Sequence, residues 1–369
     1  MNAPRIAVVM PRRMHFGPSR AGSIDLCVRD FVRFSRFRDT TTVVAEAVSD
    51  PYDDVDVVMH PPGDRRAQFA AVRRLAPDLI VAQQVLPMAA ALAAAFPETP
   101  VIAHRHNATR PGAGPFWRWR HARRLSRIAR LVYVSDHCAD SFRALWPRFA
   151  DRAARVHNGL DMAAWRPAPA EARAPVIAFA GRATGNKGVL ELAAALALTL
   201  PEAGPEWRAR LLLSRADREP DYAARVEAAL APVRDRVDVA RDRPFDEVVA
   251  LFSSAAVAVM PTKDAEPFGR SALEAMAGGA ALVSAPFGGL AEVIGDAALR
   301  IDPVTPGEIA EALRRLTVDS ALRTRLGASA RDRAESRFDI RRVAAEMDEI
   351  YADALRSGPP GKGGRLLTV

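Results

Sequence analysis

Short apolar segments alternate with longer helical runs along most of the chain, and this alternation constrains the fold more than any other feature of the sequence. Segments such as Ile6–Met10 and Leu79–Val81 are only a few residues long and are apolar at every position. Such segments are typical of parallel strands that are buried on both faces. Their alternation with helices predicts an α/β fold in which parallel sheets are covered by helices on both sides.

The expected elements of the N-terminal half follow this alternation. The expected strands are Ile6–Met10, Thr42–Ala45, Val55–Met59, Leu79–Val81, Val101–Ala103 and Leu131–Val134. The expected helices are 22–37, 64–75, 86–95, 115–129 and 137–145. The second half repeats the pattern from Val176 to Ile301, and helices are expected at 306–316, 319–333 and 338–355. A chain of 369 residues exceeds one ordinary core and suits two domains.

Composition places the chain among soluble globular proteins, with 49% hydrophobic and 26% charged residues. No apolar run reaches the ~18 residues that a membrane-spanning helix needs. Cys27 and Cys138 lack the spacing of a metal site, so we expect two reduced thiols. The apolar stretch at the N-terminus is too short for a signal peptide, and we expect a cytoplasmic protein.

A net charge of +8 indicates anionic partners, and the arginines are unevenly placed. Residues 110–130 contain seven arginines interleaved with Phe116, Trp117 and Trp119. This stretch is either a basic amphipathic helix on an anionic membrane surface or a helix with its aromatic residues in the core. For residues 29–38, which combine aromatic residues with arginines, the core interpretation is favoured.

Two carboxylates mark a candidate site in the second half. Glu266 follows a buried strand at 257–261, and Glu274 lies about one turn inside a helix that Gly278 ends. Loops between strand and helix bind ligands in doubly wound sheets. Carboxylates accept the hydroxyl hydrogens of a polyol, and the amides at 268–270 suit phosphate or sugar oxygens.

A second strand-to-helix turn supplies cations. A buried strand ends at Gly181-Arg182, and Lys187-Gly188 precedes the next helix. Two cations beside a helix N-terminus suit a diphosphate without a metal ion. Asp54-Val55-Asp56 matches a metal-binding pattern, but it lies near the amino end of a strand and is interpreted as a solvated turn.

These motifs, in this order, resemble the family-4 retaining glycosyltransferases of GT-B fold. The shared motifs are Gly181-Arg182…Lys187-Gly188, Glu266-Pro267-Phe268-Gly269…Glu274-Ala275-Met276-Ala277, and Gly288-Gly289…Glu292-Val293-Ile294. The resemblance implies two Rossmann-like domains facing a cleft: an acceptor-binding domain at 1–165 and a donor-binding domain at 172–337. It also implies that a helix at 338–356 crosses back to the first domain, and a flexible tail is expected at 357–369.

The resemblance also implies roles for named residues. Arg182 and Lys187 would hold the diphosphate beside Gly181, and Glu266 would bind the donor sugar. Residues 267–270, which are Pro267, Phe268, Gly269 and Arg270, would support sugar and phosphate, and Glu274 would bind the ribose. The loop after the first strand carries Gly22-Ser23 where the family usually has a glycine pair. His106 would orient the sugar or acceptor, with His104 as the rival.

The expected activity is transfer of a sugar from a nucleoside diphosphate sugar, with UDP as the expected nucleotide, to a glycan or lipid-linked acceptor. The anomeric configuration would be retained, and neither a metal nor a cofactor is expected. A GT-B sugar phosphorylase or a nucleotide-sugar epimerase is the alternative enzyme. A basic nucleic-acid-binding protein is a distant alternative, because the chain carries no signature of a known nucleic-acid-binding motif.

Overall fold

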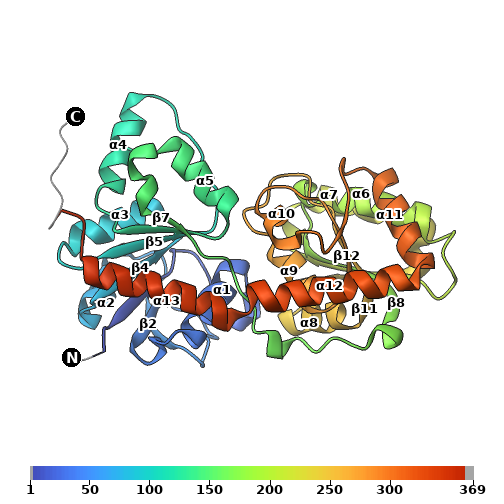
Figure 1. The fold of residues 1–369 in the computed structure, drawn as a ribbon, viewed down its shortest axis with the longest axis horizontal. Helices are drawn as coiled ribbons and strands as arrows, with labels where there is room; N and C mark the ends of the chain where they lie inside the picture. Colours follow the sequence, from blue (N-terminus) through green and yellow to red (C-terminus); the bar gives the residue numbers. More distant parts are fainter. Residues whose placement is uncertain (1–2, 362–369) are drawn as a thin grey trace. The chain divides into compact units, whose positions relative to one another are not determined.

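The computed structural model describes residues 3–361, which divide into two compact units (Figure 1). The first unit contains the residues up to Gly159 together with those from Ile340 onward. The second unit runs from Leu160 to Asp339. The C-terminal helix therefore belongs to the same unit as the N-terminal strand, although the whole second unit separates them in the sequence.

The division between the units comes earlier than the expected end of the first domain at 165. The ring of Trp165 packs edge-on against Phe245, with ring centroids 6.2 Å apart. Its carbonyl oxygen accepts a hydrogen bond of 3.1 Å from Arg331. The segment leading to Trp165 is thereby attached to the second unit.

The first unit is built on a parallel sheet with the order β3-β2-β1-β4-β5-β6-β7. Its strands are β1 (Ile6–Val9), β2 (Thr41–Glu46), β3 (Asp56–His60), β4 (Leu79–Gln83), β5 (Val101–Arg105), β6 (Arg130–Tyr133) and β7 (Ala153–Arg155). Its helices are α1 (Ser23–Phe34), α2 (Arg65–Leu75), α3 (Leu86–Ala95), α4 (Pro115–Leu125), α5 (Asp136–Leu145) and α13 (Ile340–Ser357). The order changes direction between β1 and β4.

One face of this sheet is covered by α1 and α13, which lie side by side (Figure 1). Ile6 and Val8 of β1 share a core with Phe31 of α1 and Met347 of α13. The carboxylate of Asp348 accepts hydrogen bonds from Ser35 and Arg36, which directly follow α1. The expected return of the C-terminal helix to the first domain is therefore confirmed.

The second unit is built on a parallel sheet with the order β10-β9-β8-β11-β12-β13. Its strands are β8 (Ala174–Arg182), β9 (Arg208–Ser214), β10 (Val237–Arg241), β11 (Ala255–Met260), β12 (Ala281–Ser284) and β13 (Leu299–Arg300). Its helices are α6 (Val189–Thr199), α7 (Pro220–Leu230), α8 (Phe245–Ser254), α9 (Arg270–Ala277), α10 (Gly289–Ile294), α11 (Pro306–Val318) and α12 (Ser320–Phe338). Here the order changes direction between β8 and β11.

The C-terminal segment departs in detail from the expected elements. The helix expected at 319–333 continues to Phe338, and the chain leaves helical geometry only at Asp339 before α13 begins. Ser357 is the last residue of α13, and most of the tail expected at 357–369 lies outside the described residues. Among residues 3–361, no helix combines the length and the apolar character that crossing a membrane requires.

Candidate functional site

The candidate site of the second unit lies where its sheet changes direction. The crossovers from β8 and β11 leave toward opposite edges of the sheet, so the loops at the carboxyl ends of these strands diverge at the position where doubly wound sheets bind ligands. The loop after β8 spans 183–188, and the loop after β11 spans 261–269. Both motifs that the sequence analysis singled out therefore lie at one edge of one sheet.

Lys187 and Glu266 form an ion pair across these two loops. The ammonium Nζ of Lys187 donates to Oε1 of Glu266, and the side chains are only 18% and 13% exposed. The two residues were expected to bind neighbouring parts of one donor, the diphosphate and the sugar, but their direct contact was not expected. Because the pair is mostly shielded from water, removal of either partner leaves a poorly solvated charge.

A glycine allows the two loops to approach. Gly188 has φ +66°, and a Cβ atom there would lie 1.9 Å from the carbonyl oxygen of Pro261. The amide of Lys263 donates to the carbonyl of Asn186 at 2.9 Å. Only glycine fits this close passage, and it brings Lys187 within reach of the opposite loop.

A third loop holds the backbone of Glu266. The amide of Glu266 donates to Phe287 at 3.2 Å, and its carbonyl accepts from Gly289 at 2.7 Å. Gly288 has φ +65°, and a Cβ atom there would lie 2.6 Å from the carbonyl oxygen of Glu266. The glycine pair after β12 thus fixes the position of the carboxylate, which is the physical reason for this motif.

Arg182, the second predicted cation, is placed differently from Lys187. It is the last residue of β8, its side chain is exposed, and it forms no ion pair with the acidic side chains of residues 3–361. The half-buried Gly181 precedes it in the strand. The guanidinium therefore stands at the edge of the site with its charge uncompensated, while the ammonium of Lys187 is already paired.

The residues after Glu266 form the start of α9. Pro267 is half-buried, whereas Phe268 is buried and packs edge-on against Phe338 at a centroid distance of 5.9 Å. Gly269 has φ +100°, and a Cβ atom there would lie 2.5 Å from Cδ1 of Leu290. The amides at 268–270 consequently stand at the N-terminal turn of the helix, as the sequence predicted.

Glu274 lies one turn inside α9, and its carboxylate is buried against Arg270. Nε of Arg270 donates to Oε1 of Glu274 at 2.9 Å, and the two side chains are 6% and 7% exposed. From the sequence, Glu274 was expected to bind the ribose, and only the backbone amide of Arg270 was given a role of its own. The spacing of four residues between opposite charges could have revealed the pair.

In the first unit, both candidate histidines are buried beside the carboxyl end of β5. Nε2 of His106 lies 3.0 Å from Oε1 of Gln83, and its backbone amide donates to Oε1 of Gln84 at 2.8 Å. The rings of His104 and His106 are 4.4 Å apart. Burial lowers the pKa of His104 to about 3, and burial with His104 nearby lowers the pKa of His106 well below its ordinary value. Both rings are therefore neutral.

The neutral state limits what His106 can do. An amide oxygen accepts only, so Nε2 of His106 carries the hydrogen that Gln83 receives, and Nδ1 is left as the acceptor. His104 belongs to β5, and its ring packs edge-on against Phe31 at 5.7 Å. His106 follows the strand, so it is the better placed of the two at the ligand edge.

The loop after β1 does not leave the amide of Gly22 available. This amide donates to Oδ1 of the buried Asp25 at 2.7 Å, and the hydroxyl of Tyr52 donates to the other carboxylate oxygen at 3.1 Å. Ser23 begins α1 and is exposed. Asp25 was not among the expected residues, although an acidic residue three positions after the N-cap residue, here Gly22, is typical of a capping interaction.

The expected solvated turn at 54–56 is corrected for Asp54, which is half-buried, whereas Asp56 is exposed. The carboxylate of Asp54 accepts hydrogen bonds and ion pairs from Arg29 at 2.7 Å and Arg33 at 2.9 Å. Asp56 accepts a hydrogen bond from the hydroxyl of Thr42. Asp54 therefore binds arginines of α1, and Asp56 binds a side chain of the neighbouring strand β2. The favoured core interpretation of residues 29–38 is confirmed by the burial of Phe31.

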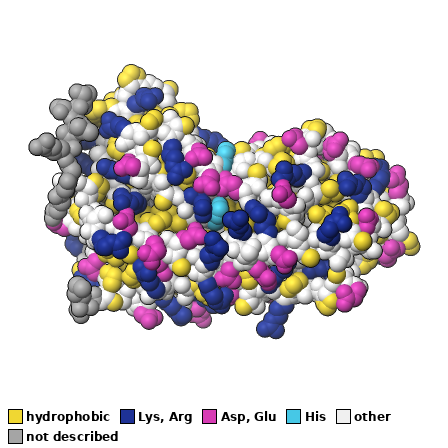
Figure 2. Space-filling view, viewed as in Figure 1, with side chains coloured by type: hydrophobic (Ala, Val, Ile, Leu, Met, Phe, Trp, Pro, Cys, Tyr) yellow, Lys and Arg dark blue, Asp and Glu magenta, His cyan; other side chains and the backbone are white. Residues whose placement is uncertain are grey.

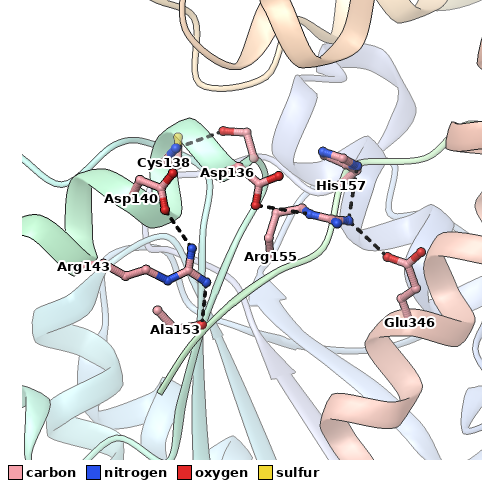
Figure 3. A network of polar contacts seen from close by, with 9 residues as sticks. Asp136, Cys138, Asp140, Arg143, Ala153, Arg155, His157 and Glu346 are labelled. Atoms are coloured by element: carbon pink, nitrogen blue, oxygen red, sulfur yellow. Dashed lines mark hydrogen bonds and ion pairs between the residues drawn. The ribbon is translucent and has the colours of Figure 1, made fainter. Parts of the chain in front are cut away.

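A polar network at the ends of β6 and β7 was not anticipated (Figure 3). The guanidinium of Arg155 lies 3.6 Å from Asp136, 3.4 Å from Glu346 and 3.4 Å from Nδ1 of His157. It connects the edge strand to the start of α5 and to α13. No sequence pattern predicts this network, because β7 is too short to be recognised from periodicity.

Each of the two units matches a known protein family. Residues 174–319 match the family described as glycosyl transferases group 1, and residues 27–164 match glycosyltransferase family 4. A glycogen synthase of Mycobacterium tuberculosis is 30% identical over 319 residues, which cover 80% of this chain and 73% of the relative. The chain belongs to the family-4 glycosyltransferases.

Other relatives match shorter parts of this glycosyltransferase. A D-inositol 3-phosphate glycosyltransferase of Streptomyces bingchenggensis is 31% identical over 255 residues, covering 62% of this chain and 53% of the relative. An alpha-maltose-1-phosphate synthase of Mycolicibacterium smegmatis is 30% identical over 246 residues, covering 60% of this chain and 62% of the relative. The chain thus spans little more than half the length of these curated relatives.

Solved structures share the fold. Anabaena HepE in complex with UDP and glucose has a TM-score of 0.77 at 20% identity, covering 95% of this chain and 100% of that chain. A glycosyltransferase of Rickettsia africae has a TM-score of 0.79 at 14% identity, covering 96% and 100%. Together with the two parallel sheets, these neighbours confirm the expected GT-B fold.

The two neutral histidines predict a pH-dependent stability. An unfolded chain binds protons on both residues near the ordinary pKa of 6.5, whereas the folded chain does not. Their stabilisation is therefore present above pH 6.5 and is lost as the pH falls below it, by ~1.4 kcal/mol per pH unit for each histidine. The free energy of unfolding, measured with urea between pH 7.5 and 5, is expected to fall with decreasing pH. His104→Leu is expected to halve the slope of this dependence on pH. The matched control His137→Gln, at an exposed position, should keep the slope, and equal slopes in all three proteins would contradict this assignment.

Proposed function

We propose that this glycosyltransferase moves a sugar from a nucleoside diphosphate sugar, with UDP as the nucleotide, to a hydroxyl of a cell-envelope glycan or lipid-linked acceptor, with retention. The observation that carries the proposal is the contact between Lys187 and Glu266 at the point where the second sheet changes direction. Binding of a diphosphate requires a cation, and binding of a sugar requires a group that accepts hydrogen bonds from its hydroxyls. Here the ammonium of Lys187 and the carboxylate of Glu266 supply both, and they are in contact. The fold neighbour HepE, solved with UDP and glucose, supports the choice of nucleotide.

The donor would bind by exchanging partners with the ion pair. As the diphosphate approaches Arg182, it draws the ammonium of Lys187 toward its own oxygens. The carboxylate of Glu266 is thereby released to accept hydrogen bonds from the donor-sugar hydroxyls. Both cations then neutralise the charge that develops on the leaving diphosphate, which is transition-state stabilisation by fixed charges.

The remaining residues hold the two substrates. Glu274, oriented by Arg270, would accept the ribose hydroxyls, and the amides at 268–270 would support sugar and phosphate. His106 would orient the sugar or the acceptor through Nδ1. The described side chains offer no evident covalent nucleophile, so the leaving phosphate would help to remove the acceptor proton on the same face of the sugar. We place the protein in the cytoplasm, at the inner face of the membrane.

Substitution of the cations tests the diphosphate site. Lys187→Ala and Arg182→Ala are each expected to lower kcat/KM by ~10²-fold or more, because each removes a charge-assisted contact worth ~2–3 kcal/mol. Steady-state kinetics with UDP-glucose as the first donor tried would measure the loss. Arg215→Ala, at an exposed arginine of the same unit, is the matched control. Near-normal kinetics for both site variants would exclude the diphosphate assignment.

Substitution of the carboxylates separates the sugar from the nucleoside. Glu266→Gln is expected to lower kcat strongly without weakening UDP binding, because it removes the sugar contact and frees Lys187 from its partner. Glu274→Gln is expected to weaken UDP binding by ~1–3 kcal/mol, the range for a hydrogen bond to a charged group. Calorimetry with UDP and kinetics with the donor would be run on both, with the exposed Glu308→Gln as control. The reverse pattern would exchange the two roles.

Chelation tests whether the two cations replace a metal ion. We expect transfer activity to persist after EDTA treatment, since Arg182 and Lys187 supply the positive charge that a divalent ion supplies in other sites. Activity would be measured before and after chelation, and again after addition of Mg²⁺ or Mn²⁺. Complete loss that either ion restores would contradict metal independence.

The alternative enzymes have distinct signatures. A sugar phosphorylase would require free phosphate, and a nucleotide-sugar epimerase would turn over the donor without an acceptor. Incubation of the protein with the donor alone, with free phosphate, and with an acceptor separates the three reactions. Transfer seen only with the acceptor supports the proposed function.

A further inference from the structure

The helix α4 has two faces of opposite character, and only the inner one is packed. The ring of Trp117 on the inner face contacts those of His121 and Trp146 in tilted arrangements, with centroids 4.2 Å and 5.7 Å apart. The backbone of Gly112 covers the same indole, since a Cβ atom there would lie 2.2 Å from its Nε1. Leu125 completes this buried side. These contacts account for the inner aromatic residue and leave the outer ones unexplained.

The outer face of α4 presents two large aromatic side chains to solvent. Phe116 is 69% exposed and Trp119 is 56% exposed, and their rings stack with centroids 5.9 Å apart. The other exposed large hydrophobic side chains among the described residues stand on separate elements: Met59, Val85, Leu198 and Val318. Single exposed apolar residues are ordinary, whereas an exposed aromatic pair marks an interaction surface.

Arginines surround this aromatic pair without acidic partners. The guanidinium of Arg120 lies over Phe116 at 5.9 Å, and that of Arg123 lies over Trp119 at 5.6 Å. Arg118 is also exposed, but its guanidinium lies over Trp146 at 5.9 Å, and Arg127 is exposed just beyond the end of α4. No acidic residue occurs between 110 and 130, and none of these four arginines forms an ion pair with an acidic side chain of residues 3–361.

Along α1 and directly after it, by contrast, arginines beside aromatic residues are compensated. Arg29 and Arg33 of α1 share the carboxylate of Asp54, and Arg36 pairs with Glu349 at 2.7 Å. Figure 2 likewise shows basic and acidic side chains interspersed over the visible face of the molecule. The outer face of α4 departs from this arrangement, so its excess positive charge calls for an anionic partner outside the chain.

We propose that the outer face of α4 docks on the surface of an anionic lipid bilayer. Stacked aromatic rings suit the boundary between headgroups and acyl chains, and arginines beside them reach lipid phosphates. Single-stranded nucleic acid is bound in a basic groove that follows its backbone, whereas α4 presents its exposed aromatic pair and the arginines over it on one outward face. This inference rests on the proposed function, for which it names the partner: a membrane that carries the acceptor.

The test is co-sedimentation with phosphatidylcholine vesicles that contain or lack phosphatidylglycerol. The unmodified protein is expected to bind the anionic vesicles at low salt and to dissociate as salt is raised. The triple variant Arg120→Ser, Arg123→Ser, Arg127→Ser should bind at least ~10-fold more weakly, since each basic residue near such a surface adds to binding. The double variant Phe116→Ser, Trp119→Ser should also lose binding, although its charge is unchanged.

Two control variants test whether the effects are specific to α4. Arg65→Ser, Arg73→Ser, Arg74→Ser on α2 removes the same charge from exposed positions and should retain binding, as should Val318→Ser. Equal loss in the α2 variant, or no binding at low salt, would overturn the proposal. Displacement of the vesicles by single-stranded RNA at low concentration would instead assign the surface to nucleic acid.

Calorimetry with UDP distinguishes this inference from the proposed function. The α4 variants lie in the first unit and should bind UDP as the unmodified protein does. Vesicle binding without UDP binding would support the docking surface on α4 and contradict the proposed activity. UDP binding without vesicle binding would support the proposed activity and contradict the docking surface.

Discussion

The candidate site depends on two close passages of backbone against backbone. At Gly188 the loop after β8 passes the carbonyl of Pro261, and at Gly288 the loop after β12 passes the carbonyl of Glu266. Any side chain at either glycine would push the loops apart. The ion pair between Lys187 and Glu266 is therefore a product of the backbone, since the loops hold both groups in place before a ligand arrives.

Several arginines of this protein bind carbonyl groups at the ends of its own helices. A helix leaves its last carbonyl oxygens without partners, and guanidinium groups supply them. Arg173 donates to the carbonyl of Ala255 at 2.7 Å beyond α8, and Arg333 donates to Glu292 at 2.7 Å near the end of α10. Arg323 donates to the carbonyl of Leu316 in the last turn of α11. The planar guanidinium, with several donors in a fixed geometry, suits this use.

The sequence predicted the parallel sheets and the loops that carry the motifs, because buried parallel strands are apolar at every position and glycines mark the turns. It did not predict that Lys187 contacts Glu266, since the contact depends on how closely two distant loops approach. It also left open whether His104 or His106 reaches the ligand edge. The edge strand β7 gave no pattern at all, because three half-buried residues carry no periodicity.

The last helix has a consequence for how the chain acquires its structure. Asp348 of α13 accepts hydrogen bonds from the hydroxyl of Ser35 at 2.5 Å and from the amide of Arg36 at 2.8 Å, and Met347 fills the core over β1. The second unit is a continuous segment, whereas the first unit needs residues from both ends of the chain. During synthesis on the ribosome, the segment translated first must therefore wait with part of its apolar sheet uncovered. The segment translated second has all its strands and helices as soon as it emerges, so the order of completion reverses the order of translation.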